Sequence, residues 1–194
     1  MDVRDPVFSN LFQTLKGLRP GAVVAIDGRC GSGKSSLAAV IARELPCHVV
    51  HTDDFYLPPQ CRSADWMNHP AGNMDLERLS AQVLVPLREK GEAQYCPFVC
   101  RTGEFGESRS LAAKALTIVE GSYSHHPSLA EEYDLKIFLT CTPEVQQARI
   151  RAREQDEVRF AHFCQIWIPL EERYFCTFAI PEHADLVMDT STLF

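Results

Sequence analysis

Short apolar runs alternate with amphipathic segments along most of the chain. The apolar runs have the length of buried β-strands and lie at residues 22–27, 48–52, 115–119, 135–140 and 185–189. The amphipathic segments repeat their apolar residues every three to four positions, which predicts helices at residues 6–18, 34–45, 75–90, 143–154 and 157–175. Buried strands that alternate with helices are typical of a parallel sheet covered on both faces. The pattern therefore predicts an α/β fold with about five parallel strands.

Two prolines and two less regular segments interrupt this pattern. Pro86 is expected to kink or end the helix at 75–90, and Pro169 to interrupt the last helix. Residues 57–73 are rich in Pro, Asn and other polar side chains, which predicts an excursion over the surface. Residues 94–110 carry a Gly-Glu-Phe-Gly turn between β-prone stretches and predict a β-hairpin.

The composition narrows the class of protein. The 194 residues suit a single domain, expected over residues 1–194 with a helical segment at 1–20. The net charge of −7 argues against a general binder of nucleic acid or membrane surfaces. No apolar run approaches the ~20 residues of a membrane span and no signal peptide is recognisable, so a cytoplasmic location is expected. The eight cysteines include no C-x-x-C pair and are expected to be mostly buried free thiols.

The junction between the first strand and the second helix carries the most specific motif. Residues 22–37 read AVVAIDGRCGSGKSSL, which is Gly-x-x-x-x-Gly-Lys-Ser between a strand and a helix, the pattern of a phosphate-binding P-loop. Backbone N–H groups and a Lys charge bind the phosphates of a nucleotide in such a loop, and the Ser hydroxyl binds Mg²⁺. The alternative is a Gly-rich turn that binds nothing, which the flanking strand and helix disfavour. We expect the nucleotide to be bound by Gly28, Gly31, Ser32, Gly33, Lys34, Ser35 and Ser36.

Carboxylates follow two other predicted strands at their carboxyl ends. Asp53 and Asp54 come directly after the second strand, and Glu120 ends the third. The carboxyl ends of parallel strands meet at one edge of a sheet, so these groups are expected beside the P-loop. Asp53 could accept a proton from a substrate hydroxyl or help to hold Mg²⁺, and the alternative is a turn cap. Glu120 is expected to interact with Mg²⁺ or its water, and the alternative is a solvated strand end.

Arginines follow the fourth strand on the predicted helix at 143–154. Arg149 and Arg153 are four residues apart and share a helix face. Arginine forks suit the negative charge that spreads over a transferred phosphoryl group. The alternative is a solvated basic face that pairs with neighbouring acidic residues. A catalytic role for Arg149 and Arg153 beside Lys34 is therefore a hypothesis.

Four elements together resemble the uridine kinase-like branch of P-loop kinases, to which phosphoribulokinase is related. They are the P-loop, Asp53-Asp54-Phe55-Tyr56, Asn73-Met74-Asp75 and Glu120-Gly121. The resemblance covers about residues 21–153 and implies ATP- and Mg²⁺-dependent transfer of the γ-phosphate to a hydroxyl of a nucleoside or a similar small acceptor. It also leaves a homo-oligomer open, because members of this family often form oligomers.

The resemblance assigns roles to individual positions. It makes Asp53 the base on the nucleoside 5′-hydroxyl, and it places Tyr56 in the acceptor pocket, Asp75 on the ribose hydroxyls and Tyr95 near the nucleobase. Residues 57–110 are then the acceptor-binding excursion, and residues 149–160 are a lid over ATP.

One departure concerns the nucleobase. Arg101 follows the Tyr-Cys-Pro-Phe-Val-Cys stretch where uridine–cytidine kinases carry a His. Arg101 could contact a carbonyl or an anion on the acceptor, or be a solvated hairpin charge. The alternative function from another class is a P-loop regulatory or chaperone-type ATPase that uses no small-molecule acceptor.

Overall fold

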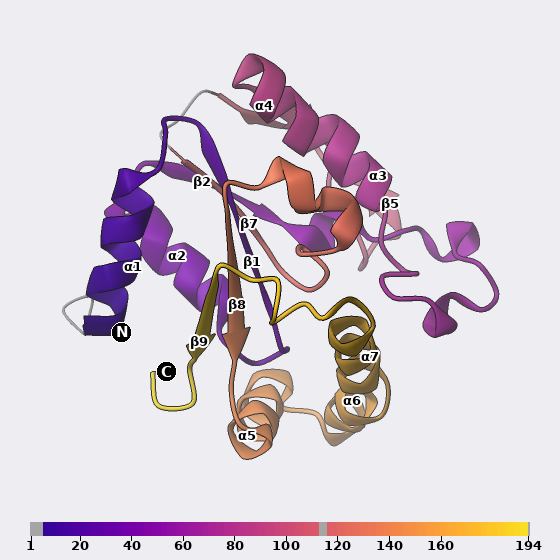
Figure 1. Cartoon of the computed structure of the whole chain (residues 1–194). Coiled ribbons are helices and arrows are strands. Elements are labelled where there is room, and N and C mark those ends of the chain that lie inside the picture. Colours follow the sequence, from indigo (N-terminus) through magenta and orange to yellow (C-terminus); the bar gives the residue numbers. More distant parts are fainter. Residues whose placement is uncertain (1–5, 113–115, 194) are drawn as a thin grey trace.

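A five-stranded parallel sheet forms the centre of the molecule (Figure 1). The computed structural model describes residues 6–112 and 116–193. Every paired neighbour in this sheet is parallel, in the order β2-β7-β1-β8-β9. The strands are β1 (Ala22–Gly28), β2 (Cys47–His51), β7 (Leu116–Glu120), β8 (Leu135–Thr140) and β9 (Leu186–Asp189). The predicted α/β fold is confirmed; residue 115 of the predicted third strand lies outside the described residues.

Helices cover both faces of the sheet because successive strand residues point to opposite sides. On β1, Val23 packs into one apolar cluster and Val24 into the other. The Val24 cluster includes α1 (Pro6–Gly17) and α2 (Lys34–Glu44), which lie together on one side in Figure 1. The Val23 cluster includes side chains of α3 (Leu76–Leu79), α4 (Val85–Lys90) and α7 (Ile168–Phe178). Residues 1–5 of the predicted N-terminal segment lie outside the described residues.

The α-helix is interrupted before both Pro86 and Pro169, as expected, and the interruption takes the same form at each. A π-helical turn, Ser80–Leu84, joins α3 to α4, and Val85, directly before Pro86, donates its N–H to the Ser80 carbonyl five residues back. A second π turn, Phe163–Trp167, joins α6 (Glu157–His162) to α7 in the same way before Pro169. Proline lacks an N–H and its ring crowds the carbonyl four residues back, and a wider turn relieves that crowding. The helical path therefore continues past both prolines.

The segment between β2 and β7 forms the predicted excursion and hairpin. A short helix η1 (Thr52–Phe55) follows β2, and two further 3₁₀ turns, η2 (Pro59–Cys61) and η3 (Trp66–Asn68), follow it. The hairpin is confirmed: β3 (Ala93–Tyr95) pairs with β6 (Arg109–Leu111), and β4 (Phe98–Val99) pairs with β5 (Glu104–Phe105). The remaining helices are η5 (Pro127–Glu132) and α5 (Pro143–Glu154).

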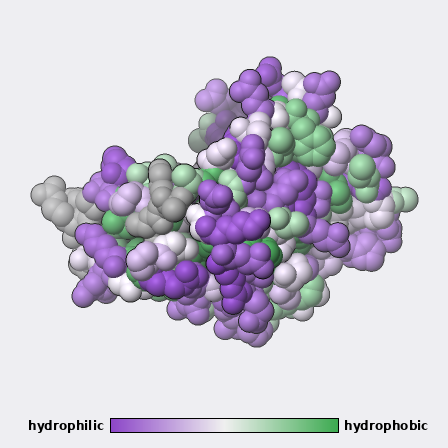
Figure 2. Space-filling model, turned by 90° about the horizontal axis from the view of Figure 1, so that it is seen from above, coloured by the Kyte–Doolittle hydropathy of each residue, from purple (hydrophilic) through white to green (hydrophobic). Residues whose placement is uncertain are grey.

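The surface is mostly hydrophilic, with hydrophobic residues in small groups in the view of Figure 2. Among the described residues, no helix is long and apolar enough to cross a membrane. All eight cysteines lie outside disulfides, as predicted, but only three are buried and three are exposed. The expectation that most are buried is therefore wrong. Cys61, Cys100 and Cys176 are the exposed ones, and all three lie outside the central sheet.

Candidate active site

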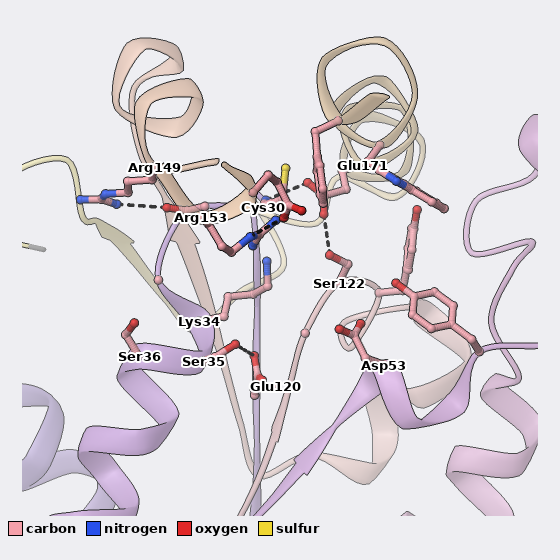
Figure 3. Close-up of a pocket in the computed structure, with 18 of the residues that line it drawn as sticks. Cys30, Lys34, Ser35, Ser36, Asp53, Glu120, Ser122, Arg149, Arg153 and Glu171 are labelled. Carbon is pink, nitrogen blue, oxygen red and sulfur yellow. Dashed lines mark hydrogen bonds and ion pairs between the residues drawn. The ribbon is translucent and has the colours of Figure 1, made fainter. Parts of the chain in front are cut away.

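A cavity of about 920 Å³ opens where the strands of the sheet end (Figure 3). Its volume is at the upper end of the range for small-molecule sites. The P-loop and the strand ends contribute Cys30, Gly31, Gly33, Lys34, Ser35, Ser36, Asp53, Glu120, Gly121, Ser122 and Tyr123. The surrounding segments contribute Tyr56, Arg62, Cys100, Arg149, Arg153, Glu154, Phe163, Trp167 and Glu171.

The P-loop has the backbone that its glycines predict. Gly28, Gly31 and Gly33 all have positive φ, at 138°, 76° and 93°. At Gly28 a Cβ would lie 2.0 Å from the Leu139 carbonyl oxygen, so only glycine lets the loop pack against β8. Lys34 turns back over the loop and donates from Nζ to the Gly28 carbonyl at 2.6 Å. Gly28 and the fully buried Ser32 lie behind the cavity wall, and the other predicted loop residues line it.

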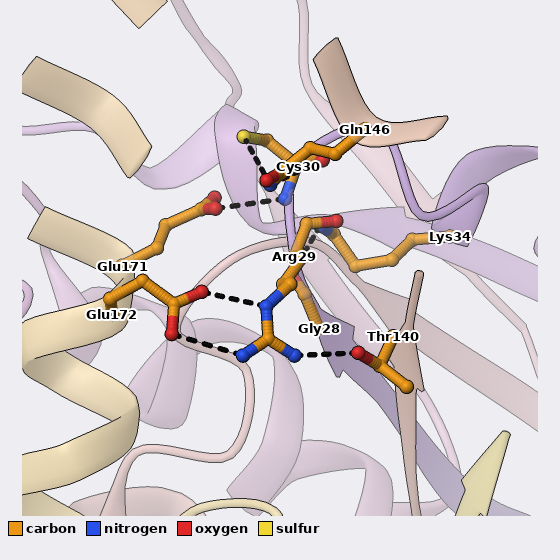
Figure 4. Close-up of polar contacts among 8 residues, drawn as sticks. All are labelled: Gly28, Arg29, Cys30, Lys34, Thr140, Gln146, Glu171 and Glu172. Carbon is orange, nitrogen blue, oxygen red and sulfur yellow. Dashed lines mark hydrogen bonds and ion pairs between the residues drawn. The ribbon is translucent and has the colours of Figure 1, made fainter. Parts of the chain in front are cut away.

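Helix α7 holds the P-loop in place through two adjacent glutamates (Figure 4). Glu171 accepts a hydrogen bond from the Cys30 backbone N–H at 2.8 Å. Glu172 forms a two-point ion pair with Arg29, at 2.7 and 3.0 Å, and the same guanidinium donates to the Thr140 hydroxyl at 2.5 Å. The residues after Gly28 are thus fixed from the C-terminal part of the chain, which sequence reasoning missed.

Glu120 and Ser35 form the candidate metal side of the cavity. Glu120 is buried, and one of its oxygens accepts from the Ser35 hydroxyl at 3.2 Å. The other oxygen forms a hydrogen bond with Nδ1 of His51 at 2.5 Å, and this hydrogen bond raises the pKa of His51. A hydroxyl and a carboxylate beside a phosphate loop are the oxygen ligands that Mg²⁺ takes together with nucleotide phosphates. The residues present therefore fit Mg²⁺ bound with a nucleotide.

Asp53 lies in η1 at the side of the same cavity, where the sequence places it. Its carboxylate points toward the space in front of Lys34 and the Ser35–Glu120 pair (Figure 3). Desolvation of its carboxylate by the surrounding atoms raises the pKa of Asp53, and the charge of Glu120 raises it further. A hydrogen bond with Tyr56 acts in the opposite direction. The net upward shift makes Asp53 a stronger base than an ordinary aspartate.

The two predicted arginines both line the cavity, in different ways. Arg149 donates to the Gly31 carbonyl at 3.2 Å and to the Thr190 carbonyl at 2.7 Å. The Thr190 hydroxyl in turn donates to the Ser32 carbonyl, so the turn after β9 also touches the loop. Arg153 pairs with its neighbour Glu154 at 2.8 Å. Arg153 therefore forms an ion pair on the helix surface, which is the alternative to a catalytic role that the sequence left open.

No protein-family profile matches the chain, and no curated protein matches it. Solved structures do. A possible uridine kinase from Bacillus stearothermophilus matches with a TM-score of 0.72 and 19% identity, over 97% of this chain and 100% of that one. Phosphoribulokinase from Rhodobacter spheroides matches with a TM-score of 0.58 and 15% identity, over 87% of this chain and 69% of that one. D-glycerate 3-kinase from Cryptococcus neoformans matches with a TM-score of 0.56 and 16% identity, over 84% of each.

The chain has the fold of P-loop kinases. Within this kinase fold, three residues predicted to bind the acceptor do not line the cavity. Asp75 caps α3 instead, accepting from the Arg78 backbone N–H at 3.0 Å and pairing with the Arg78 side chain at 3.2 Å. Tyr95 is buried, stacks on Phe55 with ring centroids 5.1 Å apart and donates to Asp54 at 3.0 Å.

The third of these residues, Arg101, lies exposed in the turn of the hairpin, and its neighbour Cys100 lines the cavity in its place. Tyr56 is the one predicted acceptor residue, besides Asp53, that the kinase fold brings to the cavity.

Several lining residues had no signal in the sequence. Ser122 donates to Glu171 at 2.5 Å, which links the end of β7 to α7 across the cavity. Tyr123 is buried and has a positive φ of 70°, an unfavourable conformation for a bulky residue that often marks functional sites in structures. Arg62 and Trp167 come from a surface segment and from a helix that proline was expected to break. Only the packing of distant segments brings these residues together.

Proposed function

We propose that this protein is an ATP- and Mg²⁺-dependent kinase that phosphorylates a hydroxyl of a small molecule. The observation that carries the proposal is the position of Asp53 in one cavity with the P-loop and with the Ser35–Glu120 pair. A P-loop alone accounts for nucleotide binding. A carboxylate with a raised pKa, facing the same space, supplies the base that transfer to a hydroxyl requires.

The residues divide the reaction between them. Asp53 takes the proton of the acceptor hydroxyl as that oxygen attacks the γ-phosphorus and the bond to the β-phosphate oxygen breaks. Lys34 and the N-terminus of α2 stabilise the phosphate charge, and Arg153, which lines the cavity from α5, would add positive charge near the transferred group. Ser35 and Glu120 would hold Mg²⁺, which would neutralise the charge that develops on the phosphate oxygens. Arg149 positions the loop through the Gly31 carbonyl.

A hydroxyl acceptor is supported from two sides. The Asp53–Tyr56 element resembles that of uridine kinase-like enzymes, for which a nucleoside is the acceptor. The kinases that share the fold are named for different acceptors, among them D-glycerate. Contacts of Asp75, Tyr95 and Arg101 with the acceptor remain predictions from the resemblance.

Coupled release of ADP with a panel of nucleosides, polyols, hydroxy acids and sugar phosphates tests the proposal. We expect at least one acceptor to raise the rate well above that of ATP hydrolysis in water, and Asp53→Asn to abolish that increase. ATP hydrolysis that no acceptor stimulates, and that Asp53→Asn leaves unchanged, would instead support an ATPase without a small-molecule acceptor.

A further inference from the structure

The cavity contains one arginine from outside the P-loop and α5. Arg62 comes from the excursion after η1, lines the cavity and is half-buried. Its Nε donates to the Leu57 carbonyl at 3.0 Å, and its guanidinium carbon lies 5.4 Å from the centre of the Trp66 ring. Among the described residues, no carboxylate pairs with Arg62. Its positive charge is therefore left for another group.

The segment that carries Arg62 is fixed against the C-terminal helices. Trp66 packs on Trp167, with ring centroids 6.0 Å apart, and Trp167 lines the cavity. Arg173 of α7 donates to the Met67 carbonyl at 2.8 Å. Arg62 thus stands on a supported aromatic surface, which reduces the conformational freedom that a long side chain loses on binding.

Cys100 lies near both Arg62 and the proposed base, Asp53. The Cys100 thiol lines the cavity. Desolvation raises the pKa of this thiol, the charge of Asp53 raises it further, and the charge of Arg62 lowers it. The thiol is therefore within electrostatic reach of both groups. The other cations of the lining, Lys34, Arg149 and Arg153, come from the P-loop and α5.

We propose that the acceptor carries an anionic group, a carboxylate or a phosphate, that Arg62 binds while the acceptor hydroxyl lies at Asp53. This inference rests on the proposed kinase function and narrows it. The guanidinium fork matches carboxylate and phosphate oxygens, and such charge-assisted pairs are stronger than neutral hydrogen bonds. A neutral nucleoside offers Arg62 no such partner. The acceptor class is therefore small hydroxy acids or phosphorylated polyols.

Matched acceptors test the proposal directly. ADP release is measured with glycerol, D-glycerate and glycerol 3-phosphate, and with uridine beside ribose 5-phosphate. We expect the charged acceptors to be phosphorylated faster than glycerol and uridine. Activity with D-glycerate would indicate a carboxylate, and activity with glycerol 3-phosphate or ribose 5-phosphate would indicate a phosphate. A preference for glycerol or uridine over their charged partners would overturn the inference, while leaving the proposed kinase function intact.

Substitution assigns the preference to Arg62. Arg62→Ala should raise the KM of the charged acceptor about 10- to 100-fold and change the KM of ATP little. Arg62→Lys should recover part of the loss, because it keeps the charge without the fork. Arg43→Ala, on the exposed part of α2, is the matched control and should change neither value. A rise in the acceptor KM with Arg101→Ala and none with Arg62→Ala would assign the anion to Arg101 instead.

Tryptophan fluorescence provides a readout that does not depend on turnover. The chain has two tryptophans: Trp66 lies against Arg62, and Trp167 packs on Trp66 and lines the cavity. With a non-hydrolysable ATP analogue saturating the P-loop, titration with D-glycerate or glycerol 3-phosphate should give a saturable change that Arg62→Ala removes. A change that persists in Arg62→Ala, or no change with either anion, would contradict the proposal. Saturable binding without phosphorylation of any acceptor would contradict the kinase function alone.

Discussion

The two sides of the cavity are built in different ways. On the nucleotide side, the phosphate loop is one continuous stretch, Gly28 to Ser36, in which backbone geometry and residue type act together over a few positions. The acceptor side is assembled from η1, the excursion, the hairpin turn, the end of β7 and α7, which are far apart in the sequence. A short motif can define the first kind of surface. The second depends on which side chains tertiary packing brings together.

Removal of the proposed base should have the largest effect on turnover. It should also distinguish the acceptor side from the nucleotide side most clearly, because ATP binding does not depend on this residue. Asp53→Asn should lower kcat by about 10²- to 10⁴-fold, because the acceptor hydroxyl loses its proton acceptor while shape and hydrogen bonding are kept. Isothermal titration should show nearly unchanged ATP affinity. Turnover close to that of the unaltered protein would remove Asp53 as the base.

A substitution at Lys34 tests the nucleotide side separately. Lys34→Ala should weaken ATP binding about 10- to 100-fold, since a charged hydrogen-bonding group beside the phosphates is lost. The acceptor KM, measured at saturating ATP, should change much less. An equal loss on both sides would mean that the cavity acts as one unit rather than as two.

Weakening the contact between α7 and the P-loop should have a smaller effect on the kinetic constants. Glu172→Gln removes the charge that pairs with Arg29 and should raise the KM of ATP several-fold, because that partly exposed pair holds the loop without touching the nucleotide. Glu182→Gln, exposed just beyond α7, is the control. A rise in the acceptor KM with no change for ATP would show that Glu172 acts on the acceptor side.

The smallest expected effect is on stability. The pKa of Asp53 is raised above its ordinary value of 3.8, so its ionised form is less favourable in the folded than in the unfolded chain. Stability therefore falls as pH rises from that ordinary value through the raised pKa. Urea denaturation at pH 7 should find Asp53→Asn slightly more stable than the unaltered protein, with the difference shrinking toward pH 4. A less stable variant at pH 7 would contradict the assigned shift.

The pattern of strands, the P-loop and the strand-end carboxylates could be predicted because each depends on local sequence. Pro86 and Pro169 indicate that a helix is interrupted, but the sequence does not show that the interruption is a π turn through which the helical path continues. Asp75 lies in the stretch that matches the family, but its carboxylate is occupied as a helix cap. For Arg62, no pattern within residues 57–73 distinguishes a side chain facing the cavity from one facing solvent. That distinction arises only when Trp66 meets Trp167, about a hundred positions later.

The place of β1 in the sheet also has a consequence for the order of synthesis. The strand that leads into the P-loop is made early, yet its two neighbours are β7 and β8, and the contact from Thr190 to Ser32 closes the loop from near residue 190. A ribosome adding roughly 5–20 residues per second would therefore release the P-loop strand several seconds before its partners exist. During that interval the apolar strand Ala22–Gly28 has no sheet to join. We expect the nascent chain to be most prone to aggregation and to chaperone binding in that window.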